Sequence, residues 1–244
     1  MSTFLILQLR PEDEASDDEY AAFLDKGGLD AAQTRRIRLD REPLPEGLDP
    51  RDFAGVIVGG GPGCLSDDPA TKDPTEARIE AQILSLMPTI TAHDLPFLGC
   101  CYGIGILAHH LGGAVSKARY GEAVGAVTCT ATAAAADDPL LADLPLEFDA
   151  FVGHKEAVQA LPQGCTHLLS SAPCPFQMIR HGANVYATQF HPEADAEVFA
   201  TRIRTYRSHG YFDPSEADEL IRACQASRVQ VPERILANFI AYYG

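Results

Sequence analysis

The most constraining feature of this chain is the segment 96–113, PFLGCCYGIGILAHHLGG, which predicts a strand, a turn with a cysteine and a helix in direct succession. Residues 96–100 have the continuous apolar run of a buried parallel strand. From Gly103 the apolar side chains follow helical spacing, and Gly112-Gly113 mark the expected end of the helix.

The turn in this segment has the pattern of a nucleophile elbow centred on Cys101. Gly99 and Gly103 lie two residues before and two after it, where larger side chains would clash in a strained strand-to-helix turn. The neighbouring Cys100 is not flanked in this way. The start of a helix favours a thiolate, and the N–H of Tyr102 is placed to donate to a developing oxyanion. On this stretch alone, a buried structural cysteine is the open alternative.

A second glycine-rich turn, GGGPG at 59–63, follows the apolar strand 55–58. It is not a P-loop, since no GK[ST] follows, and Pro62 with the acidic residues after it excludes a dinucleotide-binding fingerprint. Exposed N–H groups at Gly60 and Gly61 can supply the other half of an oxyanion hole. A tight turn without function is the alternative for this loop by itself.

A histidine and a carboxylate with complementary chemistry occur near position 190. The strand 184–189 is expected to end at His191, because Pro192 cannot continue inside a sheet. Glu193 follows His191 by two residues, and in extended backbone side chains two residues apart point to the same side. A carboxylate there can orient the imidazole, which in turn can deprotonate a thiol. Cys101, His191 and Glu193 thus have the composition of a Cys-His-Glu triad, whereas a histidine bonded to backbone is the structural alternative.

Charge and cysteine usage limit the other functions. The net charge is −15 and the isoelectric point about 4.8, with no basic stretch, so we expect neither nucleic acid nor an anionic membrane as partner. The seven cysteines form no CxxC pair and no zinc-like spacing, so we expect no metal. The first residues lack a basic segment and their apolar run is short for a signal peptide. We expect a cytoplasmic protein.

These patterns predict an α/β fold with a mostly parallel central sheet flanked by helices, a flavodoxin-like three-layer sandwich, and a small antiparallel β addition. Parallel strands are expected at 3–9, 36–39, 55–58 and 96–100, and short, partly antiparallel strands between 125 and 189. Helices are expected at 17–24, 75–87 (capped by Thr75), 194–206, 214–226 (capped by Ser215) and 231–243. We expect one domain over 1–244, with 205–244 as a helical C-terminal extension.

The motifs GGGPG, PFLGCCYGIG and TQFHPE, in this order, resemble the class I, triad-type, glutamine amidotransferase domain. The CYG form of the elbow and GHKE at 153–156 look most like the amidotransferase domain of GMP synthases, in a free-standing form. The similarity is clearest from Phe53 to Val198. The N-terminal segment fits only in pattern, and the last forty or so residues look particular to free-standing relatives.

The resemblance implies that Cys101 is the nucleophile, His191 the general base and then acid, and Glu193 the orienting carboxylate. It implies oxyanion N–H groups at Gly60, Gly61 and Tyr102. The reaction would be attack on a γ-carboxamide, release of ammonia, and hydrolysis of a γ-glutamyl thioester. No cofactor is expected. The remaining candidates for substrate binding are Gly105 and His154.

Two departures from the family pattern leave the substrate open. Gly105 stands where the family usually has a glutamine that helps to hold the substrate, and Gly59 stands where it often has a serine. Three functions remain. The first is glutamine hydrolysis that delivers ammonia to a separate synthetase, because no ATP-binding motif is recognisable here. The second is a stand-alone γ-glutamyl hydrolase or peptidase. The third is a catalytically weak regulatory or binding subunit.

Overall fold

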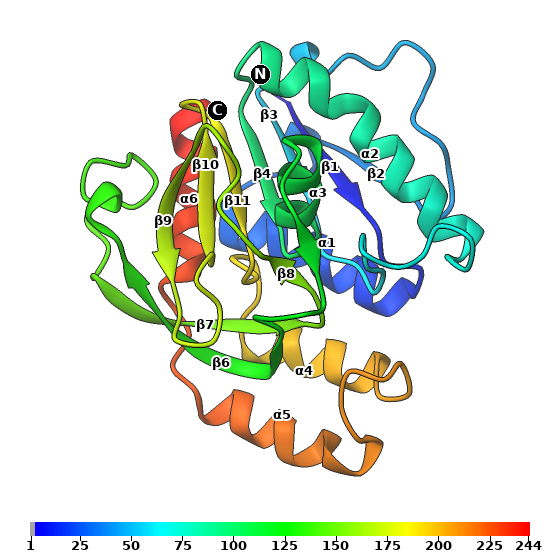
Figure 1. Cartoon of the computed structure of the whole chain (residues 1–244), viewed down its shortest axis with the longest axis vertical. Helices are drawn as coiled ribbons and strands as arrows, with labels where there is room; N and C mark the ends of the chain where they lie inside the picture. Colours follow the sequence, from blue (N-terminus) through cyan, green and yellow to red (C-terminus); the bar gives the residue numbers. More distant parts are fainter. Residues whose placement is uncertain (1–2) are drawn as a thin grey trace.

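The computed structural model describes residues 3–244 and is built around one nine-stranded sheet with the order β2-β1-β3-β4-β11-β10-β9-β6-β7 (Figure 1). Residues 1–2 lie outside the described residues. They belong to the N-terminal segment compared above with a signal peptide and to the expected domain 1–244. The strands are β1 (Phe4–Gln8), β2 (Thr34–Arg38), β3 (Gly55–Val58), β4 (Phe97–Cys100), β6 (Glu122–Ala131), β7 (Glu147–His154), β9 (Cys165–Ser170), β10 (Met178–His181) and β11 (Val185–Thr188). Two further strands, β5 (Val115–Ser116) and β8 (Ala157–Val158), pair in a separate small antiparallel sheet.

The large sheet has a parallel half and an antiparallel half. Strands β2, β1, β3, β4 and β11 pair in parallel with one another, whereas the pairs β11–β10, β10–β9, β9–β6 and β6–β7 are antiparallel. The predicted α/β class is confirmed, with its small antiparallel addition. The antiparallel strands also extend the main sheet, because a hairpin joins β10 to β11.

Helices cover both faces of the parallel half. In β1, Phe4 and Ile6 pack with α1 (Asp13–Gly27) and α6 (Pro232–Tyr243), whereas Leu5 and Leu7 pack with α2 (Pro74–Ala92) and α3 (Tyr102–His110) (Figure 1). This alternation explains the continuous apolar run, because a strand buried on both faces needs no polar side. The fully buried aliphatic and aromatic side chains contribute about 1.5–3 kcal/mol each.

Two more helices, α4 (Ala196–Thr205) and α5 (Ala217–Ala226), lie at the end of the sheet beside β6 and β7 (Figure 1). Their apolar residues form a third cluster with Phe151 of β7. The described part of the chain also contains four short 3₁₀ turns: η1 (Ala31–Gln33), η2 (Pro50–Asp52), η3 (Ala133–Ala135) and η4 (Pro214–Glu216). None of the described helices is both long and apolar enough to cross a membrane.

Several predicted element ends were wrong. The carboxylate of Asp73, not Thr75, caps α2, and Asp213, not Ser215, caps the turn before α5. In both places an aspartate two residues earlier accepts the free N–H groups, and a proline follows it at the first helical position. Helix α2 also continues through Pro88 to Ala92.

Candidate active site

Cys101 lies in the turn between β4 and α3, with φ 54° and ψ −87°. Positive φ at a residue other than glycine is strained, by about 1–3 kcal/mol, and such strain persists only where the surroundings enforce it. The reason for Gly99 is visible, since a Cβ there would lie 2.9 Å from the backbone of Gly103. A Cβ at Gly103 would make only ordinary contacts, the nearest at 3.7 Å, so the predicted clash exists on one side of the elbow.

The two adjacent cysteines have opposite surroundings. Cys100 is fully buried as the last residue of β4 and belongs to the core cluster beneath α6. Cys101 is partly exposed, and it lines two neighbouring pockets. The strand alternation therefore makes Cys100 a core residue and leaves Cys101 accessible.

The glycine loop meets the elbow because β3 and β4 are parallel neighbours, with Val58 paired to Gly99. Gly61 lines both pockets beside Cys101, and Tyr102 lines one of them. The backbone N–H groups of Gly60, Gly61 and Tyr102 have no hydrogen-bond partner within residues 3–244. Two of these residues thus bring unpaired donors to the space around the sulfur.

His191 and Glu193 are joined by a hydrogen bond of 2.9 Å between Nδ1 and Oε1. Their backbone is a turn, not the extended stretch expected, since β11 ends at Thr188 and the N–H of Ala194 returns to the carbonyl of His191. The strand ends early because the N–H of His191 donates to Phe151 of β7 instead. Because a carboxylate accepts at Nδ1, that nitrogen holds a proton and Nε2 is left as the basic atom.

A buried network of charges supports Glu193. Arg202 of α4 donates to Glu193 Oε1 at 2.7 Å, and its Nη2 is 3.6 Å from Glu19 Oε1. Arg10, just after β1, donates Nε–H to the same Glu19 oxygen at 2.8 Å. Glu19 also explains Gly59, because a Cβ there would lie 2.5 Å from its carboxylate. The serine common in the family at this position would not fit.

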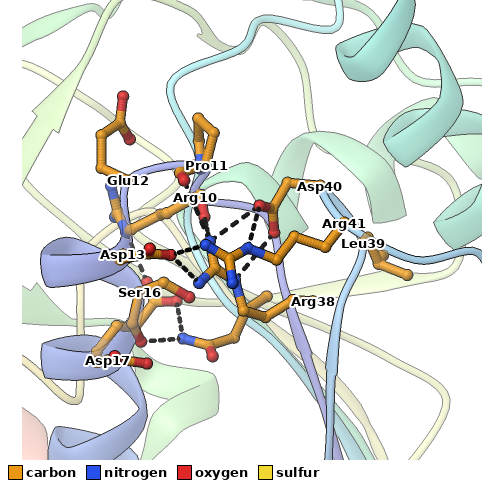
Figure 2. A network of polar contacts seen from close by, with 12 residues as sticks. Arg10, Pro11, Glu12, Asp13, Ser16, Asp17, Arg38, Leu39, Asp40 and Arg41 are labelled. Atoms are coloured by element: carbon orange, nitrogen blue, oxygen red, sulfur yellow. Dashed lines mark hydrogen bonds and ion pairs between the residues drawn. The ribbon is translucent and has the colours of Figure 1, made fainter.

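The loop that carries Arg10 is also held by contacts with Arg38 of β2 (Figure 2). Arg38, the last residue of β2, donates Nη2–H to the carbonyls of Arg10 and Pro11 at 3.2 and 3.1 Å. The same guanidinium pairs with Asp13 at the start of α1 and with Asp40. These contacts tie the loop between β1 and α1 to β2, so the backbone of Arg10 is held firmly.

The pKa values indicate a resting pair of neutral groups. Burial raises the pKa of the Cys101 thiol to about 12, although Arg10 acts in the opposite direction. Cys101 is therefore a neutral thiol at rest, not the thiolate expected at a helix start. Burial also lowers the pKa of His191, against the opposing effect of Glu193. Burial alone would raise the pKa of Glu193, but His191 and Arg202 outweigh it and hold this pKa well below its usual range.

Two pockets meet at Cys101, and they share only Gly61, Cys101, Gly153 and Tyr211. The first, the acyl pocket, contains about 390 Å³ with its open mouth and reaches Gly105, Lys155 and Glu156. The second, the histidine pocket, contains about 440 Å³ on the same measure and is lined by His191, Arg10 and Arg202. Tyr211 covers the boundary, anchored by a hydrogen bond of 3.0 Å from its hydroxyl to the carbonyl of Pro62.

The sulfur and the imidazole share the histidine pocket without a hydrogen bond between them in the described part of the chain. Gln189 Nε2 lies 4.0 Å from the sulfur. Catalytic contacts of this kind are often long before a substrate binds.

The two residues expected to bind substrate lie at the acyl pocket in different ways. A Cβ at Gly105 would meet Leu65 at 3.2 Å and a carboxylate oxygen of Glu156 at 3.7 Å, so these side chains occupy the space of the glutamine usual in the family. His154 lines the pocket, but both of its ring nitrogens bond elsewhere, to Glu122 at 2.7 Å and to the Glu156 carbonyl at 2.8 Å.

Glu122, His154 and Cys174 are close enough to form a candidate cation site, but the Glu122 carboxylate and both ring nitrogens of His154 already make hydrogen bonds within the protein. Glu122 accepts from His154, Ser171 and Gln177 through its two oxygens. The cluster orders His154 and, through it, Glu156. The Glu156 carboxylate in turn accepts the N–H groups of Leu65 and Ser66 at 2.8 and 2.9 Å.

Sequence reasoning missed Arg10, Glu19, Arg202 and Tyr211. Arg10 has a recognisable signal, since it comes two residues after a buried parallel strand, where ligand-binding groups gather. Glu19 and Arg202 lie on amphipathic helices and look like ordinary surface charges, because only the tertiary packing buries them. Tyr211 lies in an irregular loop without a motif.

Comparison with known proteins agrees with the motifs. The family model described as glutamine amidotransferase class-I matches residues 31–212, which include the range inferred from the sequence. The chain belongs to this family. A GMP synthase (glutamine-hydrolyzing) from Thermosipho africanus is 34% identical over 154 residues, 62% of this chain and 26% of that protein. The chain thus spans about a quarter of the length of such relatives.

Solved structures support the fold. A glutamine amidotransferase from Thermotoga maritima superposes with a TM-score of 0.76 over 100% of this chain and 99% of the other, at 18% identity. A glutamine amidotransferase from Methylobacillus flagellatus gives a TM-score of 0.73 at 22% identity, covering 100% of this chain and 94% of the other. At these identities the likeness establishes the shared fold.

Proposed function

We propose that this class I amidotransferase hydrolyses the side-chain amide of glutamine through a γ-glutamyl thioester on Cys101 and that the ammonia is used by a separate synthetase. The observation that carries the proposal is the strained, accessible Cys101, which shares a pocket with an imidazole whose Nδ1 is held by Glu193. The unpaired amides of Gly60, Gly61 and Tyr102 support it as oxyanion donors.

In the first half of the reaction, His191 Nε2 takes the proton of the Cys101 thiol as the sulfur attacks the amide carbon. Proton transfer within the pair is required because the thiol is neutral at rest. The negative charge passes to the carbonyl oxygen, near the free N–H groups of the glycine loop and the elbow. His191 then returns the proton to the nitrogen, the C–N bond breaks, and ammonia leaves with the thioester formed.

In the second half, a water molecule attacks the thioester carbon while His191 takes one of its protons. The C–S bond breaks, and the sulfur regains a proton from His191, leaving glutamate with a free γ-carboxyl group. Glu193 keeps the imidazole oriented and stabilises its cationic form in both halves. Arg202 and Glu19 act through Glu193 and are positioning residues.

The acyl pocket suits the amino-acid end of glutamine. Lys155 and Glu156 line it, so a cation and an anion face a zwitterionic ligand. The carboxylate of Glu156, close to Gly105, takes over the polar role that the family usually gives to a glutamine side chain. We therefore propose that Gly105 is compatible with glutamine binding and that His154 contributes by fixing Glu156.

The proposed partner follows from the name of a relative. The Thermosipho africanus protein is named as a glutamine-hydrolyzing GMP synthase, so its name joins glutamine hydrolysis to a synthase activity. We propose that a separate synthetase supplies the corresponding activity here, and that the protein works in the cytoplasm with neither nucleic acid nor membrane as partner.

The test is release of ammonia and glutamate from glutamine by the purified protein, compared with Cys101→Ala and with Cys100→Ala as the matched control. Equal amounts of both products from the wild type and from Cys100→Ala, and none from Cys101→Ala, support the proposal. Activity that survives in Cys101→Ala would exclude this cysteine as nucleophile. An inactive wild type, with and without candidate synthetases, would favour a binding or regulatory subunit.

A further inference from the structure

The free space around Cys101 is too small for glutamine as the structure stands. Measured as the volume open to the centre of a water molecule, the acyl pocket contains about 30 Å³ and the histidine pocket about 50 Å³. One water molecule needs about 10–15 Å³ on this measure, so each pocket holds a few waters and neither holds an amino acid. We propose that residues 207–212 form a lid over Cys101, and that the α-carboxylate of the substrate opens it by taking Lys155 away from the lid. This inference rests on the proposed hydrolysis of glutamine.

Tyr211 is the side chain that restricts this space. The two pockets share four residues, of which Gly61 and Gly153 contribute only backbone and Cys101 a small thiol, so Tyr211 provides the one large shared side chain. Gly153 belongs to β7, whereas Tyr211 lies in the irregular segment between α4 and α5, outside both sheets (Figure 1). A movement of this segment therefore enlarges both pockets without disturbing the sheet.

Side-chain contacts hold the lid against the site. The hydroxyl of Tyr211 donates to the carbonyl of Pro62 at 3.0 Å. Lys155 Nζ lies 4.1 Å from the centre of the Tyr211 ring and donates to the carbonyl of His209 at 3.1 Å. On the outer side, His209 Nε2 is 3.5 Å from Glu12 Oε1. No backbone-to-backbone hydrogen bond joins the lid to a strand within residues 3–244, and segments held in this way open more readily than segments of a sheet.

Lys155 connects the lid to the substrate. It comes directly after β7 and lines the acyl pocket, where the proposed function places the amino-acid end of glutamine. The lid and the α-carboxylate of glutamine therefore compete for one ammonium group. A carboxylate has a full negative charge, which the carbonyl of His209 and the ring of Tyr211 lack, so it is the stronger partner. A ligand without this carboxylate leaves Lys155 on the lid and the site closed.

The first test measures the rate at which Cys101 is alkylated, because this rate does not depend on glutamine hydrolysis. Iodoacetamide and the bulkier N-phenylmaleimide are each added to the wild type, to Tyr211→Ala and to Tyr211→Phe, and peptide mapping follows the label on Cys101. The control is Tyr242→Ala, which changes a tyrosine of α6 that is 61% exposed and outside both pockets.

We expect Tyr211→Ala to react at least about fivefold faster than the wild type with iodoacetamide, and by a larger factor with N-phenylmaleimide, because a cover excludes the larger reagent more strongly. Tyr211→Phe keeps the ring and loses the bond to Pro62, so its rates should be intermediate, and it decides the test if the alanine variant does not fold. Tyr242→Ala should match the wild type. Wild-type rates in folded Tyr211 variants, or one equal factor for both reagents, would overturn the lid.

The second test follows the lid itself. The chain has no tryptophan, so Tyr211→Trp in the Cys101→Ala protein places a single indole on the lid where no thioester can form. Glutamine should move its fluorescence to longer wavelengths, because the indole enters water. The ligand 4-aminobutanamide, which is glutamine without the α-carboxylate, should cause no shift. The control, Tyr242→Trp in the same protein, should respond to neither ligand. No shift with glutamine, or equal shifts with both ligands, would overturn the role of Lys155.

These outcomes separate the inference from the proposed function. If the wild type hydrolyses glutamine and the Tyr211 variants are alkylated at the wild-type rate, the lid is wrong and the proposed function stands. If the wild type does not hydrolyse glutamine and Tyr211→Ala is alkylated faster, the proposed function is wrong and the cover over Cys101 stands.

Discussion

The parallel and antiparallel halves of the sheet contribute different things to the same site. The parallel half brings the glycine loop, Cys101 and the segment with His191 to one edge, because β3, β4 and β11 are neighbours that all end there. The antiparallel half contributes Glu122, His154 and Gln177, which form a hydrogen-bonded cluster behind the acyl pocket. On the proposed mechanism, the parallel strands place the reacting groups and the antiparallel strands shape the wall of the substrate pocket.

This comparison predicts that substitutions in the two halves affect different kinetic constants. Residues at the carboxyl ends of the parallel strands act on bond breaking and should change kcat. Residues of the antiparallel cluster act on the bound substrate through Glu156 and should change KM.

The largest effect is expected for Cys101→Ala. Without the sulfur there is no thioester, so hydrolysis should fall by about 10⁴-fold or more, as for other nucleophile deletions. Removing a side chain from strained backbone should leave stability close to that of the wild type. Product release and thermal unfolding measured on the same sample check both statements, with Cys100→Ala as control. Residual activity within about tenfold of the wild type would be incompatible with the proposed mechanism.

The next effect is expected for Glu193→Gln. An amide at this position can donate to Nδ1 and stabilise the wrong tautomer, so kcat should fall by about 10²–10⁴-fold with KM little changed. Steady-state kinetics check this, and Asp195→Asn, at the N-cap of α4, is the nearby control. A variant with normal kcat and raised KM would assign Glu193 to substrate binding.

A smaller effect with the opposite kinetic signature is expected for Glu122→Gln. The amide leaves hydrogen-bond donors facing donors around His154, which costs about 1–3 kcal/mol of stability. The loosened Glu156 should raise KM by about tenfold, while kcat stays within about threefold. Chemical denaturation and steady-state kinetics measure the two effects. A large loss of kcat at unchanged KM would contradict the division between the halves.

The smallest effect concerns pH. His191 acts as base when neutral, and burial lowers its pKa below the ordinary 6.5, so kcat/KM should fall only as the pH drops below that value. Since the pKa of Cys101 is about 12, no thiol titration should raise the rate between pH 7 and 10. Initial rates from pH 5 to 10 provide the profile. A rise that follows an isolated thiol near pH 9 would show that Cys101 reacts independently of His191.

Much of the parallel half was predictable from the sequence. Buried parallel strands have continuous apolar runs, and the elbow at Cys101 depends on Gly99, whose place is dictated by backbone contact. The order of the motifs was enough to expect the edge where they meet. The end of β11 at Thr188 was not predictable. It depends on the hydrogen bond from the N–H of His191 to Phe151 of β7, which joins residues distant in sequence.

The buried charges show why other features could not be predicted. Glu19 and Arg202 have the spacing of solvated helix residues, and they are buried only because α1 and α4 pack against each other near Arg10. Likewise Gly59 and Gly105 looked like weaknesses of the site in the sequence. In the structure, the carboxylate of Glu19 lies close to Gly59 and the carboxylate of Glu156 lies close to Gly105.

The most direct test of the central claim is intact-protein mass spectrometry after rapid acid quench of the protein mixed with glutamine. The account predicts one γ-glutamyl adduct on the wild type and on Cys100→Ala, mapped by proteolysis to Cys101, and no adduct on Cys101→Ala. An adduct on another residue, or ammonia release at an unchanged rate from Cys101→Ala, would contradict it.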